Sequence, residues 1–303
     1  MNGFEQVYNE EMNQIHTPVL LNEVISWLRP APGKTYLDLT AGYGGHADKI
    51  LEVTQNYKDA ILNDRDTNAV KYLQAKYDTV KPQINHDSFY NAALQLVESG
   101  TKFDIVLADF GVSSPQLDRA ERGFSIARDA RLDMRMDERQ ALDAWTIVNK
   151  WNEQQLAEIF VNFGEESIGR ARMFAREIAH HRPIDTTAQL AALIKQKSGH
   201  YAKIHPATRI FQAIRIAVND ELGEISRTLP LLPRLLNPNG RVAIISFHSL
   251  EDRLVKDYFK EISERGIEAE LRVLTKKPIV AEKSELAINP RARSAKLRVA
   301  EKI

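Results

Sequence analysis

Short β-rich segments alternate with amphipathic helical segments through residues 35–109, and this alternation constrains the fold more than any other feature. The expected strands are Thr35–Thr40, Ala60–Asp64, Gln83–His86 and Phe103–Asp109. Helical patterns at 69–73 and 92–96 separate these strands. Strands that alternate with helices pair in parallel through right-handed crossovers. The pattern therefore predicts a parallel α/β sheet.

The alternation stops after the fourth expected strand. Residues 115–215 contain no convincing strand, and helices are expected at 145–163, 168–181 and 187–197. A longer helix near Pro206–Leu236 is expected to bend at its two prolines. We therefore predict that a helical insertion, 115–215, interrupts the α/β core.

Three further strands are expected after the insertion. Gly240–Phe247 is a fifth apolar strand, and Glu270–Leu274 and Lys296–Val299 form a closing pair with no helical pattern between them. A hairpin at this position adds one antiparallel strand to the sheet. The core is thus predicted to be a doubly wound α/β sheet built from residues 1–114 and 216–303.

Several classes of protein are excluded by composition. The chain of 303 residues contains no cysteine, which excludes disulfides, thiolate zinc sites, iron–sulfur clusters and a cysteine nucleophile. No stretch approaches the roughly 18 apolar residues of a membrane span. The first 14 residues are acidic and lack the apolar region of a secretory signal. We expect a cytoplasmic protein without membrane association and, because the histidine pairs lack acids at ligand spacing, without a metal.

Charge is unevenly distributed although it sums to zero. The whole chain has 41 basic and 41 acidic residues, whereas residues 168–215 have nine basic and two acidic residues. Arg172 and Arg176 share one face of an expected helix, and Arg209 and Arg215 follow. A local excess of positive charge matters more to a polyanion than the total, so this segment is predicted to bind nucleic-acid phosphates.

The first expected strand runs into a glycine-rich turn, where Gly42, Gly44 and Ala47 match the pattern G-x-G-x-x-A. Such glycines allow a tight turn and the close approach of a ligand to the backbone. Asp64 ends the second strand 22 residues after Gly42, where an acid commonly accepts hydrogen bonds from a ribose. The turn indicates either a nicotinamide dinucleotide or S-adenosylmethionine, and a plain glycine-rich turn is the alternative.

The fourth expected strand ends at Asp109, and Ser113, Ser114 and Pro115 follow. Amino-group methyltransferases have a short turn of Asp, Asn or Ser followed by proline at this position, and its oxygens hold the target amine. Acceptors for the N–H bonds localise the nitrogen lone pair and orient it toward a methyl donor. A polar loop in which Ser113 or Ser114 caps the next helix explains these residues equally well.

Eight short motifs, in order, give the chain a specific resemblance from His16 to Arg298. The motifs are His16–Glu23, Gly42–His46, Asp109–Asp118, Arg122–Ser125, Leu132–Asp137, His205–Gln212, Ile245–Arg253 and Asn289–Ser294. With these motifs the chain resembles the bacterial 16S ribosomal RNA cytosine-N4-methyltransferases, the small subunit methyltransferase H family. Phe110 stands where the family usually has leucine.

The resemblance implies a class I S-adenosylmethionine methyltransferase with a Rossmann-like sheet and an inserted helical domain. Its members methylate N4 of a cytidine in the decoding region of 16S rRNA, within the small ribosomal subunit. By position, the implied cofactor contacts are Gly44, Gly45, His46, Asp64, Phe89, Asp109 and Gln116. The candidate catalytic residues are those of the turn described above: Asp109, Ser113, Ser114 and Pro115.

Other interpretations stay open at this point. His248, at the end of the fifth strand, is a candidate substrate residue, although capping or packing explains it nearly as well. The rival functions are an amino methyltransferase of DNA or a small amine, a non-catalytic ribosome-assembly factor and a nicotinamide dehydrogenase. An intact glycine turn, Asp109 and Gln116 count against the assembly factor.

Overall fold

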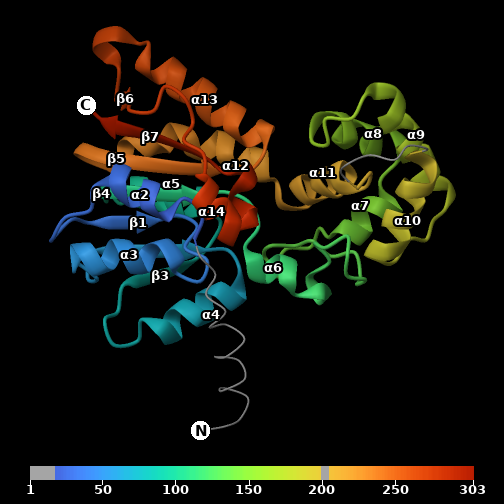
Figure 1. The fold of residues 1–303 in the computed structure, drawn as a ribbon, viewed down its shortest axis with the longest axis horizontal. Coiled ribbons are helices and arrows are strands. Elements are labelled where there is room, and N and C mark those ends of the chain that lie inside the picture. The colour runs from blue at the N-terminus through green and yellow to red at the C-terminus, as the bar shows by residue number, and fades with distance from the viewer. Residues whose placement is uncertain (1–17, 199–204) are drawn as a thin grey trace, which may run out of the picture. The chain divides into compact units, whose positions relative to one another are not determined.

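The computed structural model describes residues 18–198 and 205–303, which form two compact units. Within the described residues, the first unit combines 18–111 with Glu224–Ile303, and the second lies between Val112 and Gly223. Figure 1 shows the sheet of the first unit and the helices of the second. Among the described residues, no helix has both the length and the apolar character needed to cross a membrane. The first sequence motif begins at His16, which lies outside the described residues.

Within the described residues, the first unit is built on a seven-stranded sheet in the order β3-β2-β1-β4-β5-β7-β6. The strands are β1 (Tyr36–Asp38), β2 (Ala60–Asp64), β3 (Gln83–His86), β4 (Phe103–Asp109), β5 (Leu236–Ser246), β6 (Leu271–Val273) and β7 (Lys296–Lys302). β7 is antiparallel to both of its neighbours, whereas β1 to β5 pair in parallel. This order confirms the predicted doubly wound sheet with one antiparallel strand.

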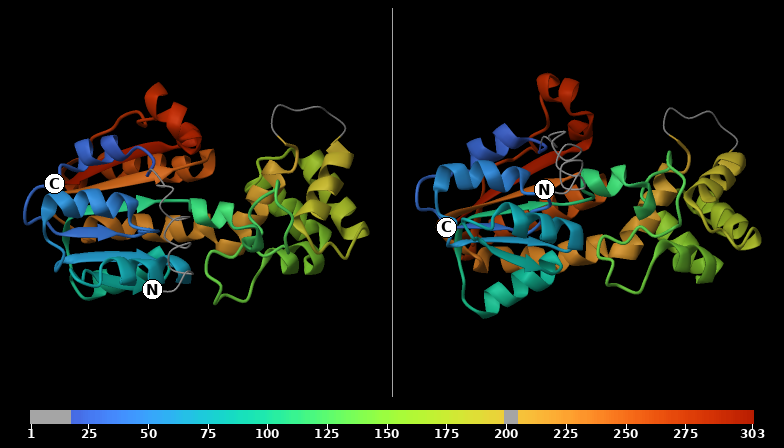
Figure 2. Two further views of the ribbon diagram at one scale, coloured as in Figure 1. Left: turned by 60° about the horizontal axis from the view of Figure 1, so that its bottom comes forward. Right: turned by 90° about the horizontal axis from the view of Figure 1, so that it is seen from below.

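Helices cover both faces of this sheet (Figure 2). The main ones are α2 (Leu21–Leu28), α3 (Gly45–Thr54), α4 (Thr67–Lys76), α5 (Phe89–Glu98) and α13 (Ser249–Ser263). Successive strand residues point to opposite faces: Leu37 packs with α5 and α13, and Tyr36 packs with α2 and α3. Burial on both faces explains why the strands are apolar throughout rather than alternating with polar residues.

The connection between the last two strands differs from the prediction. It contains α14 (Lys283–Ile288) and a 3-10 helix, η4 (Pro290–Ser294), where no helix is expected from the sequence. Ala292 and Leu286 pack onto the core of the sheet, so tertiary contacts stabilise turns too short to show a clear period.

Strand β5 also begins earlier than predicted. It starts at Leu236, which pairs with Phe103, and the register shifts before Ile105 pairs with Arg241. Gly240 lies in this irregular stretch, and a Cβ there would come within 2.9 Å of the Phe103 carbonyl oxygen. The close approach of two backbones explains the glycine that the sequence places at the strand start.

The second unit is helical in its described residues. Its elements are α6 (Ser114–Asp118), η1 (Ala120–Arg122), α7 (Ala144–Lys150), α8 (Glu153–Asn162), α9 (Ile168–His180), α10 (Thr187–Ser198) and α11 (Thr208–Asn219). The helix expected at 145–163 is in fact two helices, because Asn152 caps the start of α8. The Asn152 side-chain oxygen accepts a hydrogen bond from the Gln155 amide at 2.9 Å.

The single long helix expected near Pro206–Leu236 is wrong. Helix α11 ends at Asn219, and Asp220 has the left-handed φ of 49° that stops it. Two shorter helices follow, α12 (Glu221–Thr228) and η2 (Leu229–Arg234). Because α11 packs against α7 and α8, the compact unit Val112–Gly223 extends beyond the expected limits of 115 and 215.

Candidate active site

Three aspartates end neighbouring parallel strands at one edge of the sheet. Asp38 is the last residue of β1, Asp64 of β2 and Asp109 of β4. Strand β1 pairs with both β2 and β4, so the three ends meet at the carboxyl edge. The chain winds outward in opposite directions from β1 and β4, and doubly wound sheets bind ligands at such a switch point. The sequence predicts Asp64 and Asp109 here but misses Asp38.

Asp38 is almost fully buried. One carboxylate oxygen accepts a hydrogen bond from the Tyr36 hydroxyl at 2.6 Å, and the other accepts one from the Thr40 amide at 3.1 Å. Burial raises the pKa of Asp38 to about 7, and the nearby charge of Asp64 adds to this rise. Near neutral pH, Asp38 is therefore a carboxyl group that gains or loses its charge easily.

Asp64 holds the glycine turn in place. Its Oδ2 accepts a hydrogen bond from the Gly42 amide at 2.7 Å, and its Oδ1 accepts one from the Asp66 amide at 2.8 Å. Burial raises the pKa of Asp64 to about 6, although both amide bonds oppose the rise. The predicted ribose acceptor thus also fixes the loop that the cofactor would approach.

Asp109 is the least satisfied of the three acids. Its backbone amide donates to the Thr40 hydroxyl at 2.6 Å, and its Oδ2 lies 3.8 Å from Nδ1 of His46. Its Oδ1 is buried and has no hydrogen-bond partner among the described residues. Burial, together with the charges of Asp38 and Glu251, raises the pKa of Asp109 well above its usual range. A buried acceptor without a partner is a candidate for binding a ligand.

The three carboxyl groups fit one of the two cofactors better than the other. Each is costly to ionise where it lies, because burial raises its pKa. A bound cation offsets this cost, and S-adenosylmethionine carries a positive sulfonium and a positive ammonium group. A nicotinamide dinucleotide brings an anionic pyrophosphate, whose negative charge would make the three carboxyl groups still harder to ionise. The donor set therefore fits S-adenosylmethionine.

The glycine turn begins helix α3, and each of its implied cofactor residues also has a structural task. Gly44 has a φ of 80°, in the left-handed region that favours glycine. A Cβ on Gly45 would come within 2.9 Å of Cγ of Pro18. His46 is buried, and its Nε2 donates to the Val19 carbonyl oxygen at 2.9 Å. Gly45 and His46 thus secure the segment at Pro18 and Val19 against the turn.

Phe89 lies next to an aromatic partner on the first unit. It begins helix α5 directly after β3, and its ring centroid is 5.3 Å from that of Phe110. Phe110 follows Asp109, so the aromatic pair connects the β4 end to the α5 start. Leucine at position 110 would lack this ring contact, which is a physical consequence of the departure from the family pattern.

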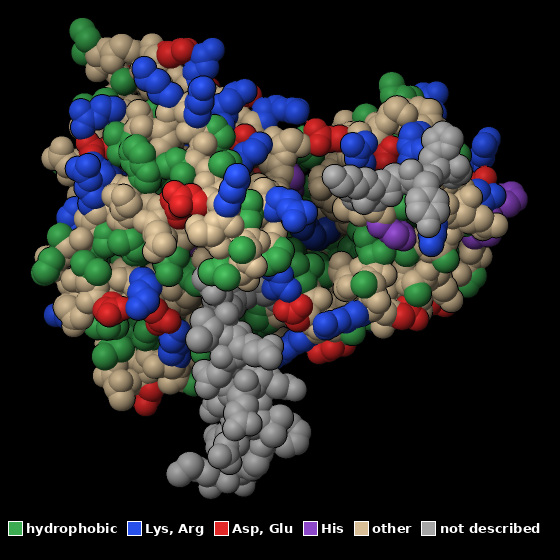
Figure 3. Space-filling view, in the orientation of Figure 1, with side chains coloured by type: hydrophobic (Ala, Val, Ile, Leu, Met, Phe, Trp, Pro, Cys, Tyr) green, Lys and Arg blue, Asp and Glu red, His purple; other side chains and the backbone are tan. Residues whose placement is uncertain are grey.

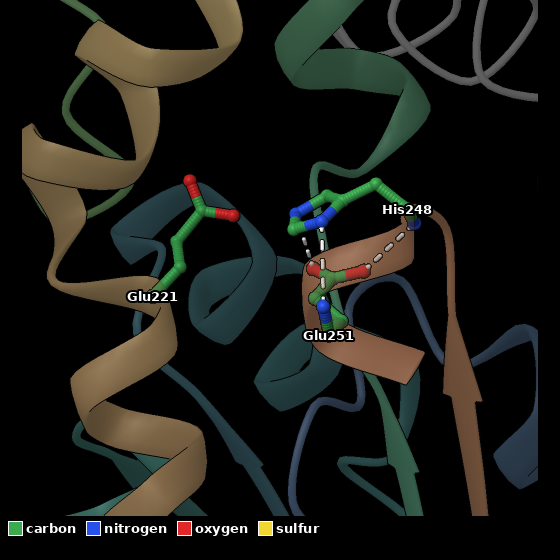
Figure 4. Close-up of side chains that lie close together, drawn as sticks. All are labelled: Glu221, His248 and Glu251. Carbon is green, nitrogen blue, oxygen red and sulfur yellow. Dashed lines mark hydrogen bonds and ion pairs between the residues drawn. The ribbon is translucent and has the colours of Figure 1, made fainter. Parts of the chain in front are cut away.

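His248 caps helix α13 (Figure 4). Its Nδ1 accepts a hydrogen bond from the Glu251 amide at 3.4 Å, and its Nε2 lies 3.2 Å from Oε1 of Glu251. The fully buried Glu251 also accepts a hydrogen bond from the Phe247 amide at 2.7 Å. The capping residues are therefore His248 and Glu251, one position before the Ser249 and Asp252 pair whose spacing also suits a capping box. The substrate role of His248 stays a prediction.

The predicted catalytic turn after β4 begins the second unit. Ser113 is the capping residue of α6, and Pro115 lies in the first turn of that helix. Oε1 of the buried Gln116 accepts a hydrogen bond from the Ser113 amide at 3.0 Å. The capping interpretation therefore holds for Ser113, and the catalytic roles of Ser113, Ser114 and Pro115 stay predictions.

The four arginines predicted to bind RNA differ in their surroundings within the second unit. Arg172 and Arg176 are exposed on α9, and Arg209 is exposed and donates to the Glu165 carbonyl oxygen at 3.3 Å. Arg215 instead lies beside a cavity of about 180 Å³, and its Nε and Nη2 each lie 2.9 Å from a carboxylate oxygen of Glu221. Arg215 is therefore paired with a carboxylate of the same chain and is not open to a phosphate group. Helix periodicity does not reveal this pairing.

The doubly wound sheet with β7 inserted antiparallel, the glycine turn after β1 and the acids that end β2 and β4 define a class I methyltransferase that uses S-adenosylmethionine. The comparison with known families makes the assignment specific. The chain belongs to the MraW methylase family, whose model matches residues 13–303.

Curated relatives named ribosomal RNA small subunit methyltransferase H align along almost the whole chain. The protein of Cyanothece sp. is 48% identical over 291 residues, which are 95% of each chain. The protein of Acidobacterium capsulatum is 44% identical over 297 residues, covering 95% of this chain and 98% of the relative. A solved putative methyltransferase from Streptococcus mutans in complex with SAH covers 93% of this chain at 10% identity and a TM-score of 0.43, too low for a comparison of sites.

Proposed function

We propose that this protein transfers the methyl group of S-adenosylmethionine to the N4 amino group of a cytidine in the decoding region of 16S rRNA. The observation that carries the proposal is identity of 44–48% with relatives named ribosomal RNA small subunit methyltransferase H, over almost the whole length of both chains. The acids at the β1, β2 and β4 ends support it, because they suit a cationic methyl donor. A substrate within the small ribosomal subunit implies that the protein acts in the cytoplasm.

The proposed cofactor residues surround the switch point of the sheet. Asp64 accepts hydrogen bonds from the ribose, Phe89 packs beside the adenine, and Gly44 and Gly45 form the turn that lies next to the ligand. Asp38 supplies negative charge toward the cationic end of the cofactor. S-adenosylmethionine, when bound, supplies a methyl group on a positively charged sulfur, whose departure as a neutral thioether drives the transfer.

Asp109 is the proposed holder of the target amine. The amino group of cytosine is a weak nucleophile, because its lone pair is delocalised into the ring. Oδ1 of Asp109 lacks a partner among the described residues and can accept a hydrogen bond from an N–H group of the amine. That bond localises the lone pair and orients it for attack, and the raised pKa of Asp109 suits it to take the proton released after transfer. Ser113, Ser114 and Pro115, a few residues further along the chain, are candidates for the same task.

Mass spectrometry of 16S rRNA fragments tests this proposal directly. Small subunits are prepared from a bacterium that lacks its own family member, and purified protein is added with S-adenosylmethionine. We expect one new methyl group, on the N4 atom of a cytidine in the decoding region. A duplex DNA and a set of small amines serve as alternative substrates. Methylation of these and not of the subunit would favour a different amino methyltransferase, and no methylation at all would favour a non-catalytic assembly factor.

A further inference from the structure

The connection between β6 and β7 is strongly basic in a chain whose net charge is zero. Residues 276–296 contain six basic and two acidic side chains. By contrast, helix α13 in the same unit balances its charges, with contacts such as Lys256 to Asp257 at 3.3 Å and Lys260 to Glu264 at 4.0 Å. Figure 3 shows Lys and Arg side chains gathered over β6, α13 and α14 on the face in view. The excess of positive charge in this region therefore comes from the connection.

Four of these cations have no acidic partner within 4.0 Å among the described residues. They are Lys276, Lys277, Lys283 and Arg293, and all four are exposed. Of the two acids of the segment, Glu285 accepts a hydrogen bond from the Leu20 amide on its Oε1 at 2.7 Å, and Glu282 forms no ion pair with these four cations within 4.0 Å. We call these four residues the basic rim. Exposed cations without partners remain available to an anion in solution.

The pairing of β7 fixes the position of the basic rim. Because β7 is antiparallel to β5, its first residue, Lys296, pairs with Ser246 at the carboxyl end of β5. The Leu274 amide donates to the Val299 carbonyl oxygen and Ile279 forms a bridge with Leu297, so Lys276 and Lys277 lie beside the start of β7, and residues 279–296 leave and re-enter the sheet at this edge. This is the edge at which β4 ends in Asp109. The buried Ala292 holds the connection against the sheet, so its cations are attached to a packed element.

We propose that the basic rim is a second RNA-binding surface, which binds the phosphate groups of the nucleotides that flank the target cytidine. This inference rests on the proposed function. A polyanion that presents one base to Asp109 must pass close to the same edge of the sheet, and its backbone carries one negative charge at each nucleotide. Lysine and arginine at a packed rim can position that backbone without reading its sequence. The rim belongs to the core unit, so its contribution is separate from that of α9 in the insertion.

Charge reversal tests the basic rim against a matched control. The rim variant is Lys276→Glu with Lys277→Glu, and the control is Lys256→Glu with Lys260→Glu on α13. Binding to small subunits from the deletion strain is measured at a series of salt concentrations. We expect the rim variant to bind about tenfold more weakly near 0.1 M salt, with the slope of log K against log salt smaller by about 0.7–0.9 for each phosphate that the variant no longer neutralises. The control should change far less, and both should keep wild-type affinity for S-adenosylmethionine.

Each outcome decides the proposal. Wild-type affinity and salt slope in the rim variant would overturn it, and so would an equal decrease in the control, which would indicate unspecific attraction. If charge reversal lowers the thermal stability, the neutral variant Lys276→Gln with Lys277→Gln and the separate variant Lys283→Gln with Arg293→Gln repeat the test. Failure of the proposed function is distinguishable, because wild-type protein would then leave the subunit unmethylated whatever the rim variants bind.

Discussion

Replacing Asp38 with asparagine tests whether burial of the Asp38 carboxyl group lowers the stability of the protein. Burial raises the pKa of Asp38 from 3.8 to about 7. Between those values the folded state binds a proton that the unfolded chain has released, so the contribution of Asp38 to the free energy of unfolding is most favourable below about pH 4 and becomes less favourable until about pH 7. The full cost of ionisation above pH 7 is about 4 kcal/mol, from a shift of about three pKa units at 1.36 kcal/mol each. Asparagine has no charge to bury and avoids this cost.

The pH dependence separates charge from hydrogen bonding. Asparagine can satisfy either the Thr40 amide or the Tyr36 hydroxyl as Asp38 does, and any weakening of the other bond is the same at every pH. At pH 5 the folded wild-type protein is largely protonated at Asp38, and about 3 kcal/mol of the cost is relieved relative to pH 8. Urea unfolding of wild type and Asp38→Asn at both pH values gives the difference directly. We expect the variant to gain about 3 kcal/mol relative to wild type on going from pH 5 to pH 8.

A stability difference that stays constant between pH 5 and pH 8 would refute this reasoning, because it would show that Asp38 keeps an ordinary pKa. Added S-adenosylmethionine provides a second check. If the buried charge faces a cation, the cofactor should stabilise wild type more than Asp38→Asn at pH 8. Equal stabilisation by saturating cofactor would leave the raised pKa intact but would remove Asp38 from the cofactor site.

The remaining predictions concern binding and catalysis. Asp64→Ala should weaken S-adenosylmethionine binding about 10–100-fold, since a hydrogen bond to a charged group contributes about 1.5–3 kcal/mol. Calorimetry against wild type and Asp64→Asn, which keeps an acceptor for the Gly42 amide, checks this, and unchanged affinity would exclude a ribose contact. Asp109→Ala should lower the single-turnover rate even at saturating cofactor, and full rescue by cofactor would limit Asp109 to cofactor binding. Arg172→Glu with Arg176→Glu should weaken small-subunit binding and reduce its salt dependence while cofactor affinity stays the same; an unchanged salt dependence would exclude α9 from the RNA contact.

The strands of the core could be predicted because the information for each is local. Continuous apolar segments such as β2 and β4 require burial on both faces, and glycine or acidic residues mark their ends. The sequence predicts β6 and β7 as a closing pair, and the structure shows that β7 is the one that lies antiparallel beside β5. Helix α14 could not be predicted in this way. It has six residues, and it is stabilised by contacts of Leu286 with a distant part of the chain rather than by its own period.

The candidate site was predictable only in part, because side-chain partners are set by tertiary structure. Asp64 and Asp109 can be predicted as site residues because they end their strands. Asp38 also ends a strand, but the sequence interpretation assigns the site there to the glycine motif a few residues later. Helix periodicity groups Arg215 with exposed cations, yet the left-handed turn at Asp220 brings Glu221 against it. A non-glycine residue at positive φ gives little signal in a single sequence.

The cost of the three carboxyl groups bears on the choice among the functions that the sequence leaves open. A ribosome-assembly factor needs a surface for RNA and gains nothing from acids whose burial lowers its own stability. A dehydrogenase would place the anionic pyrophosphate of its cofactor beside three carboxyl groups whose raised pKa values already disfavour negative charge at the switch point. A methyl donor with a positive sulfur reverses both penalties, because each carboxylate then stabilises the bound state. The sulfonium cation that the buried carboxylates stabilise becomes a neutral thioether when the methyl group is transferred. The same acids should therefore bind S-adenosylmethionine more tightly than the product and promote exchange of the cofactor after each transfer.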